Sequence, residues 1–142
     1  MAQFRSDADI EQLVSGFLDC SLPESEWTHA AHFAAALWLL RTRGSQAFVD
    51  MPPLIRAYNL SIGGQNTESA GYHETITVAS LRAAQAHLAR RPGAALHEVL
   101  AELLATPVGR SDWLLAYWSR PMLFSAVARR DWVEPDLEPL PY

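Results

Sequence analysis

The sequence predicts an all-α protein: a single-domain helical bundle of about five to seven helices over residues 1–142, with an extended tail over 131–142. Apolar residues recur at three- and four-residue spacing in several segments, as on the buried face of a helix. No segment shows a sustained alternation of β-branched residues, so strands are not expected. With 142 residues, the chain is long enough to bury one core without covalent cross-links.

The first two helices have the clearest boundaries. Ser6 precedes an apolar series at helical spacing, which predicts a first helix over about 7–20. Thr28 or Ser25 caps a second helix that runs to Arg43. Most of this second helix is apolar on nearly every side, so we expect it to lie at the centre of the bundle.

Prolines and glycines divide the next part of the chain. The pair Pro52-Pro53 predicts a short helix from Ser45, a kink, and a second helix over about 53–59. Residues 60–67 contain two adjacent glycines followed by Gln and Asn, which predicts a loop.

The remaining helices are predicted from apolar periodicity between proline or glycine breaks. They run from Thr67 or Ser69 to Arg91, and over about 94–105, 111–119 and 121–130. Apolar and aromatic residues in the tail indicate that it packs back onto the body of the protein.

Composition narrows the classes of function. The net charge of −5 and the pI of about 5.4 argue against non-specific binding to nucleic acid or to an anionic membrane. All 11 basic residues are arginine, which excludes Schiff-base chemistry on a lysine. The single cysteine, Cys20, excludes an intrachain disulfide and a multi-cysteine zinc site. No signal-peptide pattern and no apolar run of membrane-spanning length occur, so a cytoplasmic protein is expected.

A histidine cluster is the strongest indication of a functional site. His29 and His32 are three residues apart on one predicted helix, so their side chains share a face. His73 opens a different helix, and bundle sites are assembled from facing helices in this way. These three imidazoles predict a site for one divalent transition metal, and zinc, iron, copper and nickel are all compatible with imidazole ligands.

The residues around this cluster predict a small metal-dependent enzyme that acts on a small organic substrate. Glu74 follows His73 and is expected to move a proton or to complete the ligand set. Tyr72 is a second catalytic candidate. Arg56 and Asn59 precede the glycine loop and are expected to contact an anionic or amide group of the substrate.

Two alternatives need no metal. In a non-enzymatic binding module, the same polar groups read a small ligand through hydrogen bonds. In a structural or oligomeric protein, the histidines are hydrogen-bonded core residues and Glu74 is a first-turn acid stabilised by the helix dipole. A homodimer through Trp113, Trp118 and Trp132 belongs to this alternative, although buried core is the default for tryptophan.

Five segments, spread over most of the chain, carry a resemblance: Trp27-Thr28-His29-Ala30-Ala31-His32, Tyr58-Asn59, Asn66-Thr67, Gly71-Tyr72-His73-Glu74-Thr75-Ile76-Thr77 and Trp132-Val133-Glu134-Pro135-Asp136-Leu137. Together they resemble a family of small uncharacterised bacterial helical proteins. No activity accompanies that family, so the resemblance implies no mechanism and assigns no ligand residue.

Overall fold

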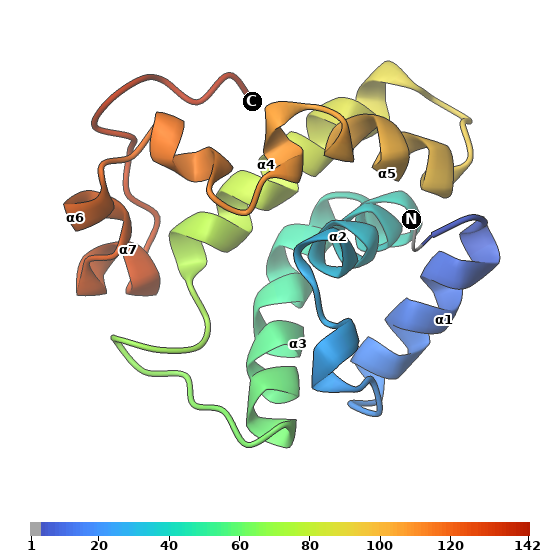
Figure 1. Ribbon diagram of the computed structural model, residues 1–142, viewed down its shortest axis with the longest axis horizontal. Coiled ribbons are helices and arrows are strands. Elements are labelled where there is room, and N and C mark those ends of the chain that lie inside the picture. The colour runs from blue at the N-terminus through green and yellow to red at the C-terminus, as the bar shows by residue number, and fades with distance from the viewer. Residues whose placement is uncertain (1–3) are drawn as a thin grey trace.

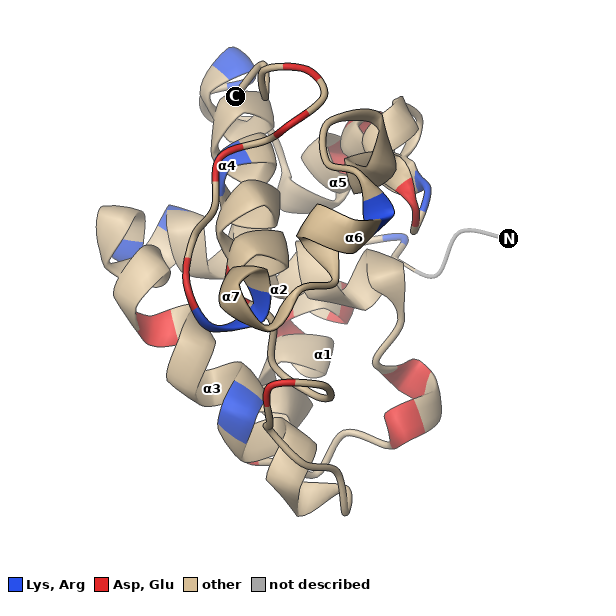
Figure 2. Cartoon of the chain, turned by 90° about the vertical axis from the view of Figure 1, so that its left-hand side faces the viewer, with Lys and Arg blue, Asp and Glu red and all other residues tan. Residues whose placement is uncertain are grey.

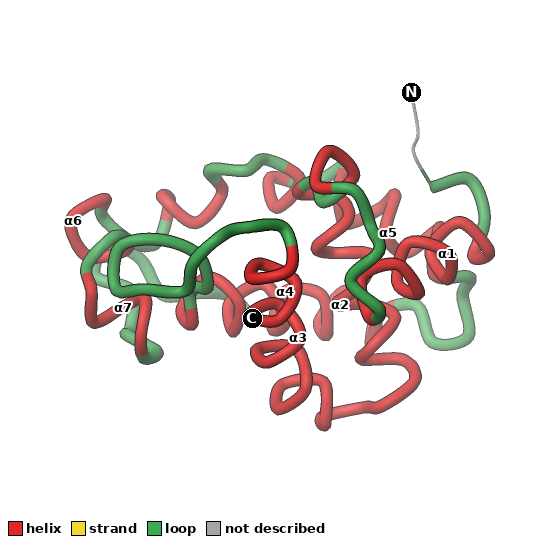
Figure 3. Tube along the Cα trace, turned by 90° about the horizontal axis from the view of Figure 1, so that it is seen from below, coloured by secondary structure: helices red, strands yellow, loops and turns green. Residues whose placement is uncertain are grey.

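A computed structural model describes residues 4–142, and every regular element in that range is helical (Figure 3). The α-helices are α1 (Asp7–Leu18), α2 (His29–Arg43), α3 (Ala47–Ser61), α4 (Glu74–Arg90), α5 (Leu96–Leu104), α6 (Arg120–Leu123) and α7 (Ala126–Arg130). Short 3-10 turns are η1 (Glu24–Glu26), η2 (Gly44–Gln46), η3 (Pro107–Gly109) and η4 (Trp113–Ala116). The all-α prediction is confirmed.

Helix α2 lies in the middle, and α1, α3, α4 and α5 pack around it (Figure 1). Its alanines let neighbouring helices approach closely, while Leu37 and Leu39 are fully buried. The Thr28 hydroxyl caps its first turn by accepting from the Ala31 N–H, and Gly44 ends it with a φ of 59°. Both predicted ends of this helix are confirmed. No helix within residues 4–142 has the length and apolar character needed to cross a membrane.

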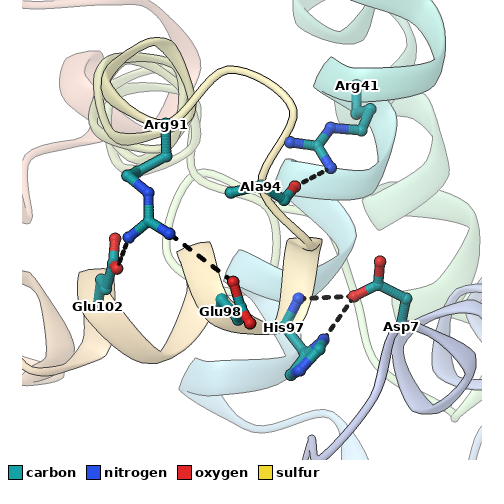
Figure 4. A network of polar contacts seen from close by, with 7 residues as sticks. All are labelled: Asp7, Arg41, Arg91, Ala94, His97, Glu98 and Glu102. Atoms are coloured by element: carbon teal, nitrogen blue, oxygen red, sulfur yellow. Dashed lines mark hydrogen bonds and ion pairs between the residues drawn. The ribbon is translucent and has the colours of Figure 1, made fainter.

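Helices α1 and α5 are joined by a polar contact that also caps a helix (Figure 4). The Asp7 carboxylate accepts from the His97 backbone N–H at 2.9 Å and lies 2.8 Å from His97 Nδ1. Because α5 has no side-chain cap of its own, Asp7 supplies from α1 the acceptor that its first turn lacks. Beside it, the Arg41 guanidinium of α2 donates to the Ala94 carbonyl at 2.5 Å.

The prediction of two separate helices divided at Pro52-Pro53 is wrong, because α3 runs through both prolines as one helix. Each proline removes a backbone donor and costs about 3 kcal/mol in a helix interior. One face of α3 is nevertheless buried along its whole length: Ala47, Met51, Ile55 and Tyr58. Burial of a large apolar side chain contributes about 1.5–3 kcal/mol. A continuous apolar face on both sides of the prolines therefore offsets their cost.

The predicted start of α4 at Thr67 or Ser69 is also wrong, since α4 begins only at Glu74. The Thr67 hydroxyl instead accepts from the Ser69 and Ala70 N–H groups and closes a turn. Gly71 follows with a φ of +84°, and a Cβ there would lie 1.7 Å from the Gln65 carbonyl oxygen. This left-handed glycine keeps the chain out of helical geometry until His73.

The C-terminal segment is less helical than predicted. Residues 111–119 form only the 3-10 turn η4, and residues 121–130 are divided between α6 and α7. The tail takes one backbone acceptor of this segment, because the Leu137 N–H donates to the Tyr117 carbonyl at 2.9 Å. The Trp118 indole also donates to the Val133 carbonyl at 3.1 Å, and the two bonds hold residues 131–142 against the body.

Candidate functional site

Two hollows flank His32 on the side of α2 that faces α4. The first, the apolar pocket, has a volume of about 440 Å³ between α2, α4 and residues 111–124. Its apolar walls include Phe33, Ile76, Trp113, Leu114, Leu123 and Phe124. The second, the Trp27 pocket, has a volume of about 460 Å³ and is lined by Trp27, Ile55, Asn59, Tyr72, His73 and Ile76 among others. His32 and Ile76 line both pockets and so form the wall between them.

The chemical state of His32 follows from its contacts. Its Nδ1 lies 2.7 Å from the Thr28 carbonyl, which can only accept, so Nδ1 carries the proton. Its ring packs on Trp27 with the ring centroids 3.9 Å apart. The pKa of His32 is lowered to about 4, mainly by burial and to a smaller extent by the neighbouring His29, against the opposing effect of the Thr28 carbonyl. At neutral pH, Nε2 therefore holds a lone pair, and it accepts no hydrogen bond from any residue in 4–142.

The other two histidines are engaged with the backbone of the C-terminal segment. His29 Nε2 donates to the Val108 carbonyl at 2.9 Å. His73 is the N-cap of α4: its Nδ1 accepts from the Ile76 N–H at 3.2 Å, and its Nε2 donates to the Leu123 carbonyl at 2.6 Å. Burial lowers the pKa of His73, which keeps this doubly bonded ring neutral. Both imidazoles therefore hold segments of the chain together.

Tyr72 and Glu74, the two predicted catalytic residues, bind each other. The Tyr72 hydroxyl donates to Glu74 Oε1 at 2.5 Å. Burial, followed by this hydrogen bond, raises the pKa of Tyr72, so the hydroxyl keeps its proton at neutral pH. Tyr72 lines the Trp27 pocket, whereas Glu74 lines neither that pocket nor the apolar one. A proton transfer from Glu74 to a ligand in the Trp27 pocket would have to pass through Tyr72, and Tyr72 does not line the apolar pocket.

Asn59 and Arg56, the predicted substrate contacts, lie on α3 in different surroundings. Asn59 lines the Trp27 pocket, where its amide donates to Asn66 Oδ1 at 3.0 Å. The same Asn66 oxygen accepts from the Tyr72 N–H, so this pair orders the glycine loop. Arg56 lies outside both pockets, with its guanidinium 4.2 Å from the centroid of the Tyr72 ring.

The predicted metal ligands are only partly brought together. Among residues 4–142, no group of three or more His, Cys, Asp or Glu side chains is arranged to hold a metal ion. His29 and His32 share the apolar pocket, as their spacing predicted. His73 lies in the Trp27 pocket, and both of its ring nitrogens are already engaged. The divalent metal stays a prediction, and this arrangement offers it two imidazoles.

Several lining residues were missed because they are distant in sequence. Ser80 of α4, Asp112 after η3 and Arg120 of α6 all line the apolar pocket. None lies at ligand spacing from a histidine, and the tertiary contacts that bring them together leave no local pattern. Trp27, which lines the Trp27 pocket, was also missed, but a local signal for it exists. An aromatic residue directly before a helix cap is positioned to pack on the first turn of that helix, as Trp27 does on His32.

Comparison with known proteins identifies no relative. No protein-family profile, no curated protein and no solved structure matches this chain. The resemblance to a bacterial helical family stays an expectation, and the function is argued from the geometry of the site.

Proposed function

We propose that this protein binds a small, largely apolar organic molecule in the apolar pocket, with neutral His32 as a hydrogen-bond acceptor. The observation that carries the proposal is the fixed tautomer of His32. Its Nε2 has a lone pair that accepts no hydrogen bond from residues 4–142. Small-molecule sites are mostly apolar hollows of about 300–1,000 Å³ with a few placed polar groups. The apolar pocket, at about 440 Å³ with two imidazoles in its wall, has these properties.

The walls indicate the kind of ligand. Phe33, Trp113 and Phe124 favour a planar or aromatic body, because aromatic pairs add to the free energy of area burial. A ligand N–H or O–H group would donate to His32 Nε2. Asp112 and Arg120 are exposed at the rim, where polar substituents of the ligand would stay hydrated.

Indole and 1-methylindole form a matched pair of probes, because they differ in a single N–H donor. We expect the protein to bind indole about 3- to 10-fold more tightly, the value of one neutral hydrogen bond. Titration followed by chemical-shift changes of the amide and imidazole nitrogens measures both affinities. The shifts are expected in α2, α4 and residues 111–124.

The His32→Phe variant keeps a ring against Trp27 but removes the acceptor, so it should bind both probes equally. The Thr28 carbonyl loses no helical bond in this variant, because it also accepts from the His32 backbone N–H at 3.0 Å. His87→Phe is the control: His87 is also buried, with a pKa lowered by burial, but it lies outside the pocket. Equal binding of the two probes by the unmodified protein would overturn the proposal, as would an indole preference that survives in His32→Phe.

A metal-dependent enzyme is the second candidate, favoured by the shared placement of His29 and His32 in one pocket. Each ring has one nitrogen bonded to a backbone carbonyl, which leaves the other for a metal. The substrate or water would complete the ligand set. Metal content of protein purified without a histidine tag tests this candidate: metal should be lost in His29→Ala and His32→Ala and retained in His73→Asn. Retention in all three variants, or no bound metal after reconstitution, counts against it.

A further inference from the structure

A third hollow is lined by Tyr72, which also lines the Trp27 pocket, and by arginines from two distant parts of the chain. This arginine pocket has a volume of about 280 Å³. Its polar lining includes Arg56 of α3, Arg129 and Arg130 of α7, and Thr67 and Glu68 of the loop between α3 and α4, here called the glycine loop. In Figure 2 the basic segments of α3 and α7 lie on the side of the molecule that faces the viewer, with an acidic residue of the loop nearby.

Both Arg56 and Arg129 are held in place by contacts with Gly71 and Tyr72. The Arg56 guanidinium lies over the Tyr72 ring, with 4.2 Å between Cζ and the ring centroid. Arg129 Nη1 donates to the Gly71 carbonyl at 3.0 Å and lies 3.5 Å from the Tyr72 carbonyl. Gly71 itself cannot change, because a Cβ there would collide with the Gln65 carbonyl. These contacts fix the two side chains before any ligand arrives, which lowers the entropic cost of binding.

The charges in this pocket are not balanced within the chain. Arg43, Arg91 and Arg110 pair with carboxylates elsewhere, and Arg130 pairs with Asp131 at 2.9 Å. Arg56 and Arg129, like five other arginines of the chain, make no ion pair with a carboxylate of residues 4–142. They differ from those five in lining one pocket together. The chain has 16 acidic residues and 11 basic ones, so acids are not scarce.

Arg129 also has a hydrogen-bond donor that is left unpaired by the described part of the chain. Arg129 Nε is buried and has no hydrogen-bond partner among residues 4–142. Buried guanidinium N–H groups are almost always paired, because leaving one unpaired costs the full desolvation of the donor. The acidic groups nearby do not supply the pair: Glu68 is exposed at the rim, and Glu74 accepts from the Tyr72 hydroxyl.

We propose that the arginine pocket binds a small oxyanion, the carboxylate or phosphate group of a small metabolite, between Arg56 and Arg129. Guanidinium groups match both oxyanions in shape and charge and form charge-assisted hydrogen bonds with them. The volume of about 280 Å³ accepts one such group with few additional atoms. This site is separate from the apolar pocket, so its test is independent of the proposed function.

Inorganic phosphate and acetate are the probes, titrated separately into the full chain at neutral pH and low ionic strength by calorimetry and by chemical-shift changes. Saturable binding that shifts resonances of α3, α7 and the glycine loop is expected. Binding of phosphate alone identifies the phosphate source, and binding of acetate alone identifies the carboxylate source. If neither probe binds at about 10 mM, where a contact of about 3–4 kcal/mol would be detected, the proposal is wrong.

The Arg56→Gln and Arg129→Gln variants should each weaken binding by about 10-fold or more, the value of one charge-assisted contact. Arg82→Gln is the matched control, because Arg82 also lies over an aromatic ring, that of Trp132 at 4.4 Å, but outside the pocket. Circular dichroism checks the fold, and Arg56→Gln suffices if Arg129→Gln does not fold. Equal affinities in Arg56→Gln and Arg82→Gln would overturn the assignment.

Discussion

The centre of the bundle around α2 and the attachment of the C-terminal segment to α4 are stabilised by different interactions. Around α2, the contacts are apolar and non-directional: Ala34, Ala35, Leu37 and Leu39 are fully buried. At the first turn of α4, directional hydrogen bonds join the side chains of His73 and Thr75 to the backbone of the C-terminal segment. Apolar packing therefore builds the centre of the bundle, and hydrogen bonds attach its C-terminal part.

The directional contacts all come from the segment Gly71–Thr77. Besides His73, the Thr75 hydroxyl donates to the Ala128 carbonyl at 2.7 Å, lies 2.9 Å from the Asp131 carbonyl, and accepts from the Val133 N–H. The Thr77 hydroxyl donates to the His73 carbonyl within α4. The polar residues that stand out in this segment thus serve as attachment points for α6, α7 and the tail. A conspicuous polar motif in a bundle can be structural throughout.

The largest expected effect is a loss of stability on removing a buried apolar side chain from α2, the apolar centre of the bundle. Leu37→Ala removes a fully buried side chain from the helix that contacts α1, α3, α4 and α5. It should lower the free energy of unfolding by about 3–5 kcal/mol, from lost burial and the cavity left behind. Chemical denaturation measures this loss. Leu137→Ala, at a leucine 54% exposed, is the control and should change stability by less than about 1 kcal/mol. Similar losses in the two variants would mean that α2 is not the centre of the core.

His73→Ala tests the directional hydrogen bonds that attach the C-terminal segment to α4. It removes the cap from the Ile76 N–H and the donor to the Leu123 carbonyl, and should cost about 3 kcal/mol. His73→Asn restores a good N-cap but not the bond to Leu123, so it should cost about half as much. Amide exchange distinguishes the two halves: in His73→Asn, amides of α6 and α7 should exchange faster while those of α2 stay protected. Uniform acceleration across α2 and α6 would contradict a locally attached C-terminal segment.

Sequence patterns predicted the apolar half well and the directional half poorly. Periodicity and Gly44 predicted the end of α2 to the residue, and its start was narrowed to two possible caps, of which Thr28 is the one used. Each of these signals is a local property of the helix. The α3 prediction failed because proline rules are local, whereas the apolar face that offsets Pro52 and Pro53 is buried by tertiary contacts. The start of α4 was misplaced because imidazole is not among the usual N-cap groups, which are hydroxyls, carboxylates and amides.

The candidate site shows the same division. Spacing of three residues correctly placed His29 and His32 beside one pocket. Residue spacing could not reveal that both ring nitrogens of His73 are hydrogen-bonded, one to the Ile76 N–H and the other to the carbonyl of Leu123, which lies 50 residues away. Of the three tryptophans considered for a dimer face, Trp113 and Trp118 are buried in the core, the default for this residue, and Trp132 is half-buried. The homodimer stays a prediction.

The smallest expected effect concerns pH and sets His32 apart from the structural histidines. Burial holds the pKa of folded His32 at about 4, whereas an unfolded histidine titrates near 6.5. The unfolded chain therefore binds a proton first, so the stability from neutral His32 is complete above about pH 6.5 and is lost as the pH falls toward 4. Because the ring is partly exposed, we expect a loss of about 2 kcal/mol between pH 7 and about 4.5.

His32→Phe isolates this contribution, since it has no proton to gain. Burial also lowers the pKa of His73 and His87, so both proteins lose some stability on acidification through these residues. The difference between the two denaturation profiles cancels that shared loss and leaves the part from His32. A difference of about 2 kcal/mol that grows only below pH 6.5 identifies a histidine kept neutral in a partly open site. Parallel profiles would instead show that His32 is protonated as readily in the folded chain as in the unfolded one, so that burial does not lower its pKa.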